Sequence, residues 1–132
     1  MSNLILCLLL LLNIYICEEP PKDMRVFEKN SIENKINVKL DEEFVLKFVN
    51  HPGINLRWRF INENEIKDSI QFLKEYEGEQ YGRISIIGNP RNVYYQFKAL
   101  KKTKEPVVIK FYHGKFEKTN LNKITVFKVN VQ

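Results

Sequence analysis

Residues 44–60 read FVLKFVNHPGINLRWRF, and this stretch decides the fold. It contains two runs in which every second residue is apolar, separated by a Pro-Gly pair. A period of two in aromatic and branched residues is typical of half-buried strands. The apolar faces consist of Phe44, Leu46 and Phe48 before the turn, and of Leu56, Trp58 and Phe60 after it. We therefore expect two strands joined through an exposed turn at residues 51–55.

The same alternation continues along the rest of the chain. Further strand faces are formed by Ile36, Val38 and Leu40, by Val93, Tyr95, Phe97 and Ala99, by Val107, Ile109 and Phe111, and by residues 124–131. Turn-forming residues separate these runs, namely Gly53, Gly88, Pro90 and Gly114. Residues 62–70 are the one candidate for a helical turn, and their Asn and Ser content favours a loop. Short strands at this spacing predict an all-β, immunoglobulin-like antiparallel β-sandwich.

The beginning of the chain is set apart from this pattern. Residues 4–16 are an apolar run interrupted by Asn13, and CEEPPKD follows at once. A bilayer span takes about 20 apolar residues, so this shorter run fits a secretory signal peptide better than an anchor. We expect residues 1–17 to be the signal peptide, cleaved near Cys17 or Glu18; a lipid-modified Cys17 is the alternative. Residues 18–132 would then form a single domain whose residues 20–23 are an extended leader.

A cleaved signal peptide implies the secretory pathway, with delivery outside the cell or to lysosome- or phagosome-like vesicles. Stable membrane insertion is not expected after cleavage. Both cysteines, Cys7 and Cys17, lie within or at the edge of the signal peptide. The mature domain would therefore have neither a disulfide framework nor a cysteine nucleophile. The net charge of +5 is spread over interleaved acidic and basic residues, which favours a solvated surface over nucleic-acid binding.

The sequence contains no pattern typical of catalysis. His51 and His113 have no partner at metal-ligand spacing, and neither a nucleophile elbow nor a phosphate-binding glycine loop occurs. The acidic residues 41–43 lie between two predicted strands and read as a solvated turn. We therefore expect no enzyme activity, no cofactor and no metal. Tyr94 and Tyr112 alternate with core positions, so they are predicted to be exposed on the sheets.

Three loops should gather at one end of such a sandwich, namely residues 51–55, 88–91 and 113–116. With the signal peptide, this layout resembles the chagasin-like inhibitors of papain-type cysteine proteases, the group that includes the amoebiasins. That family carries N-P-T-T-G-Y/F shortly before a Trp, a G-x-G-G loop and an R-P-W/F loop. The resemblance covers roughly Glu28 to Gln132. It implies a protein that blocks the protease cleft reversibly with the three loops.

The first loop matches the family pattern best. Counted back from Trp58, the family's Asn, Pro, Thr, Thr and Gly correspond here to His51, Pro52, Gly53, Ile54 and Asn55. The second loop keeps only the first residue of its pattern, in the series Gly88, Asn89, Pro90 and Arg91. In the third loop the family's Arg, Pro and aromatic residue correspond to His113, Gly114 and Lys115, with Phe116 as a substitute for the aromatic residue.

Pro52 is the residue that makes the first loop stiff. The proline ring fixes its own φ and biases His51 toward extended geometry, so the loop is stiff before it meets a partner. Ordering a stiff loop costs less binding free energy than ordering a floppy one. As a plain turn, the same residues predict a type II geometry with Pro52 and Gly53 in the centre.

Two other functions remain open from the sequence. A secreted immunoglobulin-like binding or adhesion module without protease inhibition would tolerate the altered second and third loops. A carbohydrate-binding sandwich depends on Tyr94 and Tyr112 being exposed.

Overall fold

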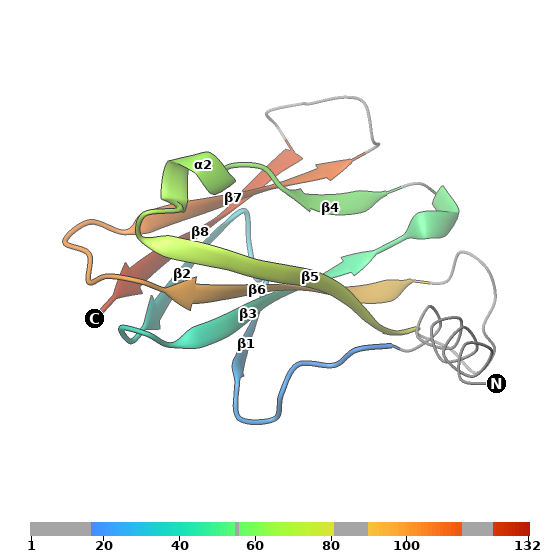
Figure 1. Cartoon of the computed structure of the whole chain (residues 1–132). Helices are drawn as coiled ribbons and strands as arrows, with labels where there is room; N and C mark the ends of the chain where they lie inside the picture. The colour runs from blue at the N-terminus through green and yellow to red at the C-terminus, as the bar shows by residue number, and fades with distance from the viewer. Residues whose placement is uncertain (1–16, 55, 81–89, 115–122) are drawn as a thin grey trace, which may run out of the picture.

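The computed structural model describes residues 17–54, 56–80, 90–114 and 123–132, and strands make up most of them (Figure 1). The elements in these ranges are, in chain order, β1 (Arg25–Glu28), β2 (Glu33–Val38), β3 (Glu43–Asn50), η1 (Pro52–Ile54), β4 (Arg57–Phe60), α2 (Glu63–Ile66), β5 (Ile70–Gln80), β6 (Arg91–Ala99), β7 (Val107–Gly114) and β8 (Ile124–Val131). The longest helix among the described residues, α2, has four residues, so no described helix spans a bilayer.

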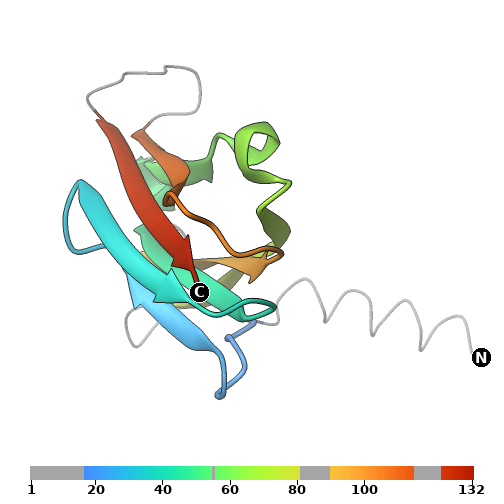
Figure 2. The same ribbon diagram turned by 90° about the vertical axis from the view of Figure 1, so that its left-hand side faces the viewer.

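The strands form two four-stranded sheets that pack face to face. One sheet has the order β1-β3-β6-β5 and the other has the order β2-β8-β7-β4. Figure 2 shows the layers from the side, with β8 in red. The pairs β3/β6, β5/β6, β4/β7 and β7/β8 are antiparallel. The predicted β-sandwich is confirmed.

Two strand pairs are parallel, which the antiparallel prediction did not include. β1 lies beside β3, and β2 lies beside β8. In the chain, β2 comes after β1 and before β3, and it runs in the opposite direction in the other sheet. The chain therefore reverses its direction twice, so β1 and β3 run in the same direction where they lie side by side.

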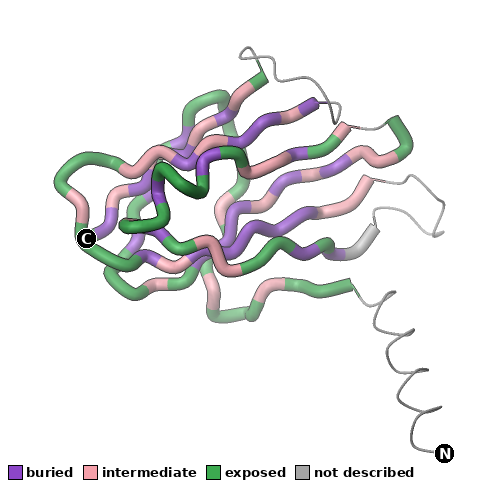
Figure 3. Tube along the Cα trace, turned by 45° about the horizontal axis from the view of Figure 1, so that its top comes forward, coloured by how far each residue is buried: buried purple, intermediate pink, exposed green. Residues whose placement is uncertain are grey.

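The core lies between the sheets and is rich in aromatic residues. Phe44, Phe97 and Phe111 have no exposed surface, and Trp58 is 6% exposed. The Phe111 ring lies 4.5 Å from that of Phe48. Figure 3 shows the buried positions concentrated on the strands, with exposed positions mainly at the turns and in the leader. The strand faces predicted around these residues are therefore confirmed.

Several local expectations were wrong. β1 and β5 were not predicted as strands: β1 has only four residues, and a register shift between Phe72 and Lys74 breaks the alternation of β5. Leu40 does not continue the buried face of β2, because the strand ends at Val38 and Leu40 lies in the following turn, 39% exposed. Residues 63–66 form the single helical turn α2, which buries Ile66.

Tyr94 is 4% exposed and is not the surface tyrosine that was expected. The leader covers it: Glu18 donates its backbone N–H to the carbonyl of Glu77 (3.0 Å), and the Tyr94 hydroxyl donates to Glu19 (2.6 Å). Met24 packs with Tyr94 in a small cluster on this outer face of the sheet. Residues 18–24 therefore form a strap across β5, β6 and β3. The strap is not extended through residues 20–23 as expected, because it turns there, with the N–H of Met24 donating to the carbonyl of Pro21 at 3.1 Å.

Tyr112 is also buried, with 2% of its surface exposed. The guanidinium carbon of Arg59 lies 5.1 Å from its ring centroid. Gly114 allows this packing, because a Cβ there would lie 2.5 Å from the Tyr112 hydroxyl oxygen. With both tyrosines buried, the carbohydrate-binding hypothesis has lost its support.

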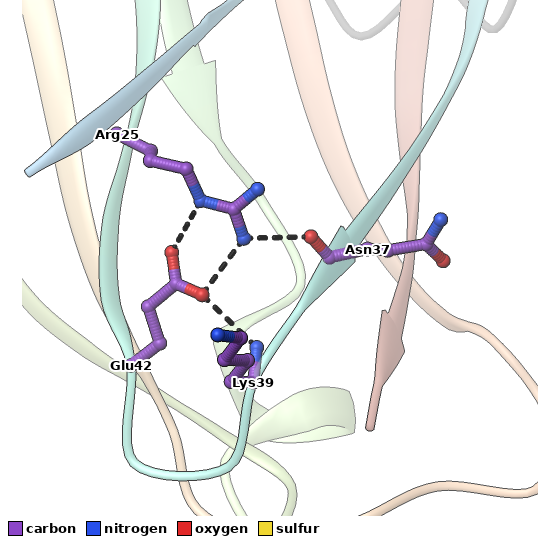
Figure 4. A network of polar contacts seen from close by, with 4 residues as sticks. All are labelled: Arg25, Asn37, Lys39 and Glu42. Atoms are coloured by element: carbon purple, nitrogen blue, oxygen red, sulfur yellow. Dashed lines mark hydrogen bonds and ion pairs between the residues drawn. The ribbon is translucent and has the colours of Figure 1, made fainter.

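The acidic turn at residues 41–43 joins β2 to β3 (Figure 4). Asp41 has a positive φ of 66°, a conformation that Asp tolerates better than most residues. Glu42 is more than a solvated side chain: it accepts two hydrogen bonds from Arg25, at 2.6 and 2.7 Å, and one from the backbone N–H of Lys39. Arg25 also donates to the carbonyl of Asn37 at 2.8 Å. The hydrogen bond from Arg25 is the largest cause that lowers the pKa of Glu42.

Candidate functional site

The turn at residues 51–56 is anchored by backbone hydrogen bonds at its base. His51 and Leu56 form an isolated bridge, with N–O distances of 2.9 and 3.1 Å. The N–H of Ile54 donates to the carbonyl of His51 at 3.2 Å. Pro52–Ile54 form a short 3-10 helix, so the turn is not the type II turn expected from the Pro-Gly pair. The position of Asn55 lies outside the described residues.

The tip of this turn presents an apolar side chain to solvent. Ile54 is 63% exposed and Gly53 is exposed, whereas Pro52 is half-buried. No buried residue occurs in the 3-10 helix. An exposed branched residue on a short turn has surface left to bury against a partner.

Buried side chains directly behind the turn hold it in place. Asn50 is 4% exposed, and its Oδ1 accepts the backbone N–H of Trp58 at 2.8 Å. This bond ties the end of β3 to β4 across the turn. The Trp58 ring stacks on Phe48 with centroids 4.6 Å apart. Sequence reasoning found Trp58 but missed Asn50, although a polar residue at the end of an apolar strand is the signal that was available.

The described ends of the other two loops lie at the same end of the sandwich. Arg91, assigned to the second loop, is the first residue of β6 and pairs with Asn50. His113 and Gly114, assigned to the third loop, are the last residues of β7 and pair with Trp58 and Arg57. Pro90 directly precedes β6 and is half-buried. The structure thus brings these positions to the base of the 51–56 turn; Gly88, Asn89, Lys115 and Phe116 lie outside the described residues.

His113 packs flat on the core tryptophan. Its ring lies 4.2 Å from that of Trp58, with an interplanar angle of 7°. Its Nε2 is buried and has no hydrogen-bond partner among the described residues. Burial lowers the pKa of His113, and the positive charges of Lys29 and His51, then of Lys123, lower it further. A protonated His113 is therefore disfavoured in the free domain.

Lys29 is a member of this site that the sequence did not indicate. Its Nζ lies 5.0 Å from the Trp58 ring centroid, a cation–π distance. Lys29 follows β1 and reaches the turn only because β1 lies beside β3. Within the described ranges no group of three or more His, Cys, Asp and Glu side chains is placed to hold a metal ion.

Comparison with solved structures relates this geometry to known proteins. The chain matches the crystal structure of the cysteine protease inhibitor EhICP2 from Entamoeba histolytica with a TM-score of 0.64 and 11% identity, over 85% of this chain and 100% of that one. It matches the solution structure of amebosin with a TM-score of 0.59 and 14% identity, over 83% and 98% of the two chains. The chain has the chagasin-like fold. No protein-family model and no curated protein matches it in sequence.

The chagasin-like fold confirms the resemblance seen in the sequence at the level of architecture. The match spans the whole chain of the E. histolytica inhibitor. At 11–14% identity the likeness concerns the backbone alone.

Proposed function

We propose that this protein is an inhibitor of papain-type cysteine proteases that blocks the active-site cleft reversibly. The first support is the fold, which it shares with a cysteine protease inhibitor. The second is the turn that begins at His51, which exposes Ile54 at its tip and is anchored by backbone hydrogen bonds at its base. Such a turn is pre-organised, so little conformational entropy is lost when it enters a cleft.

The exposed Ile54 is the observation that carries the proposal. Its side chain is 63% exposed on a 3-10 turn that contains no buried residue. In the cleft the turn would cover the catalytic thiolate. The hydrogen bonds between His51, Ile54 and Leu56 hold the backbone in a closed turn, unlike the extended peptide that a protease cleaves. Inhibition would therefore proceed without turnover of the inhibitor.

The second and third loops would contact the walls of the cleft on either side of the turn. Arg91 and His113 support this arrangement, since both pair with residues next to the turn. Residues 88–91 and 113–116 are accordingly proposed as the flanking contacts.

The proposed location is the secretory pathway, with delivery outside the cell or to lysosome- or phagosome-like vesicles. The apolar run of residues 4–16, followed by CEEPPKD, supports a cleaved signal peptide. Sequencing the amino terminus of the protein recovered from a eukaryotic secretion host tests this. An amino terminus at Glu18 agrees with the proposal, and an intact Met1 contradicts it.

The test of function is a titration of the purified protein against papain and related proteases. We expect competitive, reversible inhibition, and an inhibitor that stays intact by mass spectrometry after long incubation. Full protease activity at micromolar concentrations of the protein would overturn the proposal. In that case the alternative, an immunoglobulin-like binding or adhesion module without inhibitory activity, takes its place.

A further inference from the structure

A pocket of about 350 Å³ opens beside the 51–56 turn, between that turn and the residues that follow β1. Trp58 and Phe48 give it an apolar wall. Lys29, His51 and His113 also line it, and they come from three separate parts of the chain. The pocket thus combines an aromatic wall with several basic groups.

The basic groups among the described lining residues of this pocket outnumber the carboxylates. Among the described residues that line it, Glu28 is the only carboxylate, and it is bound to Lys47 at 3.0 Å. Lys29 forms no ion pair among the described residues; its contact is the face of Trp58. The positive field is strong enough to contribute to the lowered pKa of His113. An anion would therefore be favoured here over a cation.

One of the lining residues, His113, has an unsatisfied polar atom. His113 Nε2 is buried without a hydrogen-bond partner among the described residues, which costs free energy in the free domain. Because this atom is buried, the His113 ring would have to shift before the nitrogen, when it carries a proton, donates to a carboxylate oxygen in the pocket. A second oxygen of the same group would be available to Lys29, and charge-assisted hydrogen bonds of this kind are stronger than neutral ones.

We propose that this pocket binds a carboxylate, and that its occupant is an acidic side chain of the bound protease. His51 belongs both to the pocket and to the base of the turn, so the pocket opens on the face that would meet the protease. This inference rests on the proposed function for its occupant. The preference for a carboxylate rests on the pocket alone, and the two parts can be tested separately.

The preference of the pocket for a carboxylate is tested without a protease, by the fluorescence of a residue in its wall. Trp58 is the only tryptophan in the chain, so its fluorescence reports on the pocket directly. We expect sodium acetate to change the emission saturably, whereas sodium chloride at equal ionic strength does not. The Lys29→Glu variant should abolish the response to acetate, and Lys29→Gln should weaken it.

The identity of the occupant is tested by measuring the inhibition constants of variants against papain. Lys29→Glu should raise the inhibition constant at least tenfold, and Lys101→Glu, an exposed charge reversal in the β6–β7 connection, should leave it unchanged. Equal constants for the two variants, with the acetate response retained, would overturn the protease side chain as occupant and leave a site for free carboxylates. Equal constants without an acetate response would overturn the whole inference. An acetate response in a protein that inhibits no protease would refute the proposed function but support the carboxylate pocket.

Discussion

Replacing Ile54 with Asp distinguishes whether the 51–56 turn binds a protease or only supports the fold. The side chain is 63% exposed, so little of it supports the free domain. Surface substitutions of this kind change the free energy of unfolding by about 0.5 kcal/mol or less. We therefore expect the melting temperature of Ile54→Asp to stay close to that of the wild type.

The same substitution should have a large effect on binding. Full burial of an isoleucine side chain contributes about 1.5–3 kcal/mol, and roughly two thirds of this remains available to a partner because that share of Ile54 is still exposed. The variant loses about 1–2 kcal/mol of this apolar contribution, which alone weakens binding by about 5- to 30-fold. The buried carboxylate of the new Asp adds a desolvation cost. We expect at least a tenfold rise in the inhibition constant.

The assay is a titration of papain at equal concentrations of folded inhibitor, with thermal unfolding measured on the same samples. Ile61→Asp is a matched control: Ile61 is 40% exposed and follows β4, at the far end of that strand from the turn. It should leave inhibition unchanged. If Ile54→Asp unfolds the domain but inhibits normally per folded molecule, the turn is structural and Ile54 does not contact the protease.

Three further predictions concern stability. Trp58→Ala removes a 6% exposed ring that stacks on Phe48 and on His113, and it should cost about 3–5 kcal/mol in chemical denaturation. Because the pKa of His113 is lowered on folding, the folded state disfavours its proton, and stability should fall as the pH drops below about 6.5. His113→Phe should flatten this dependence in melting curves at pH 7 and pH 5, and an unchanged slope would assign the effect to other groups. Glu42→Gln should lower the unfolding free energy at pH 7 by about 1 kcal/mol, since Arg25 is half exposed. This difference should vanish under acid conditions, because a carboxylate whose pKa is lowered on folding stabilises only above that pKa; a constant difference would contradict the assignment.

The strand faces were predictable because successive residues of a strand point to opposite sides of the sheet, so buried residues recur at every second position. Phe97 and Phe111 are fully buried, as their alternation predicted. Alternation fails where a strand is irregular, which is why β5 was missed around Leu73. It also fails where another segment covers the outer face, as the leader covers Tyr94. Such coverage depends on tertiary packing, and no periodic pattern in the sequence indicates it.

The candidate site was only partly predictable, for a related reason. Ile54 stood out as an apolar residue in a turn, and its exposure agrees with that interpretation. Lys29 had no local signal, since its contact with Trp58 depends on a parallel pairing between β1 and β3. The 3-10 geometry of the turn was missed because Pro-Gly is compatible with more than one turn type.

The pairing of β2 with β8 limits when the protein can fold during its synthesis. Glu33 lies opposite Val126, and Val38 lies opposite Val131, so the second sheet joins segments more than 90 residues apart. Closing so long a loop is slow, and it cannot begin before the later partner has been made. On a translating ribosome, β2 is therefore an edge without a neighbour until β8 emerges. A nascent chain stalled before residue 126 would expose this edge, which makes it a substrate for chaperones or for aggregation.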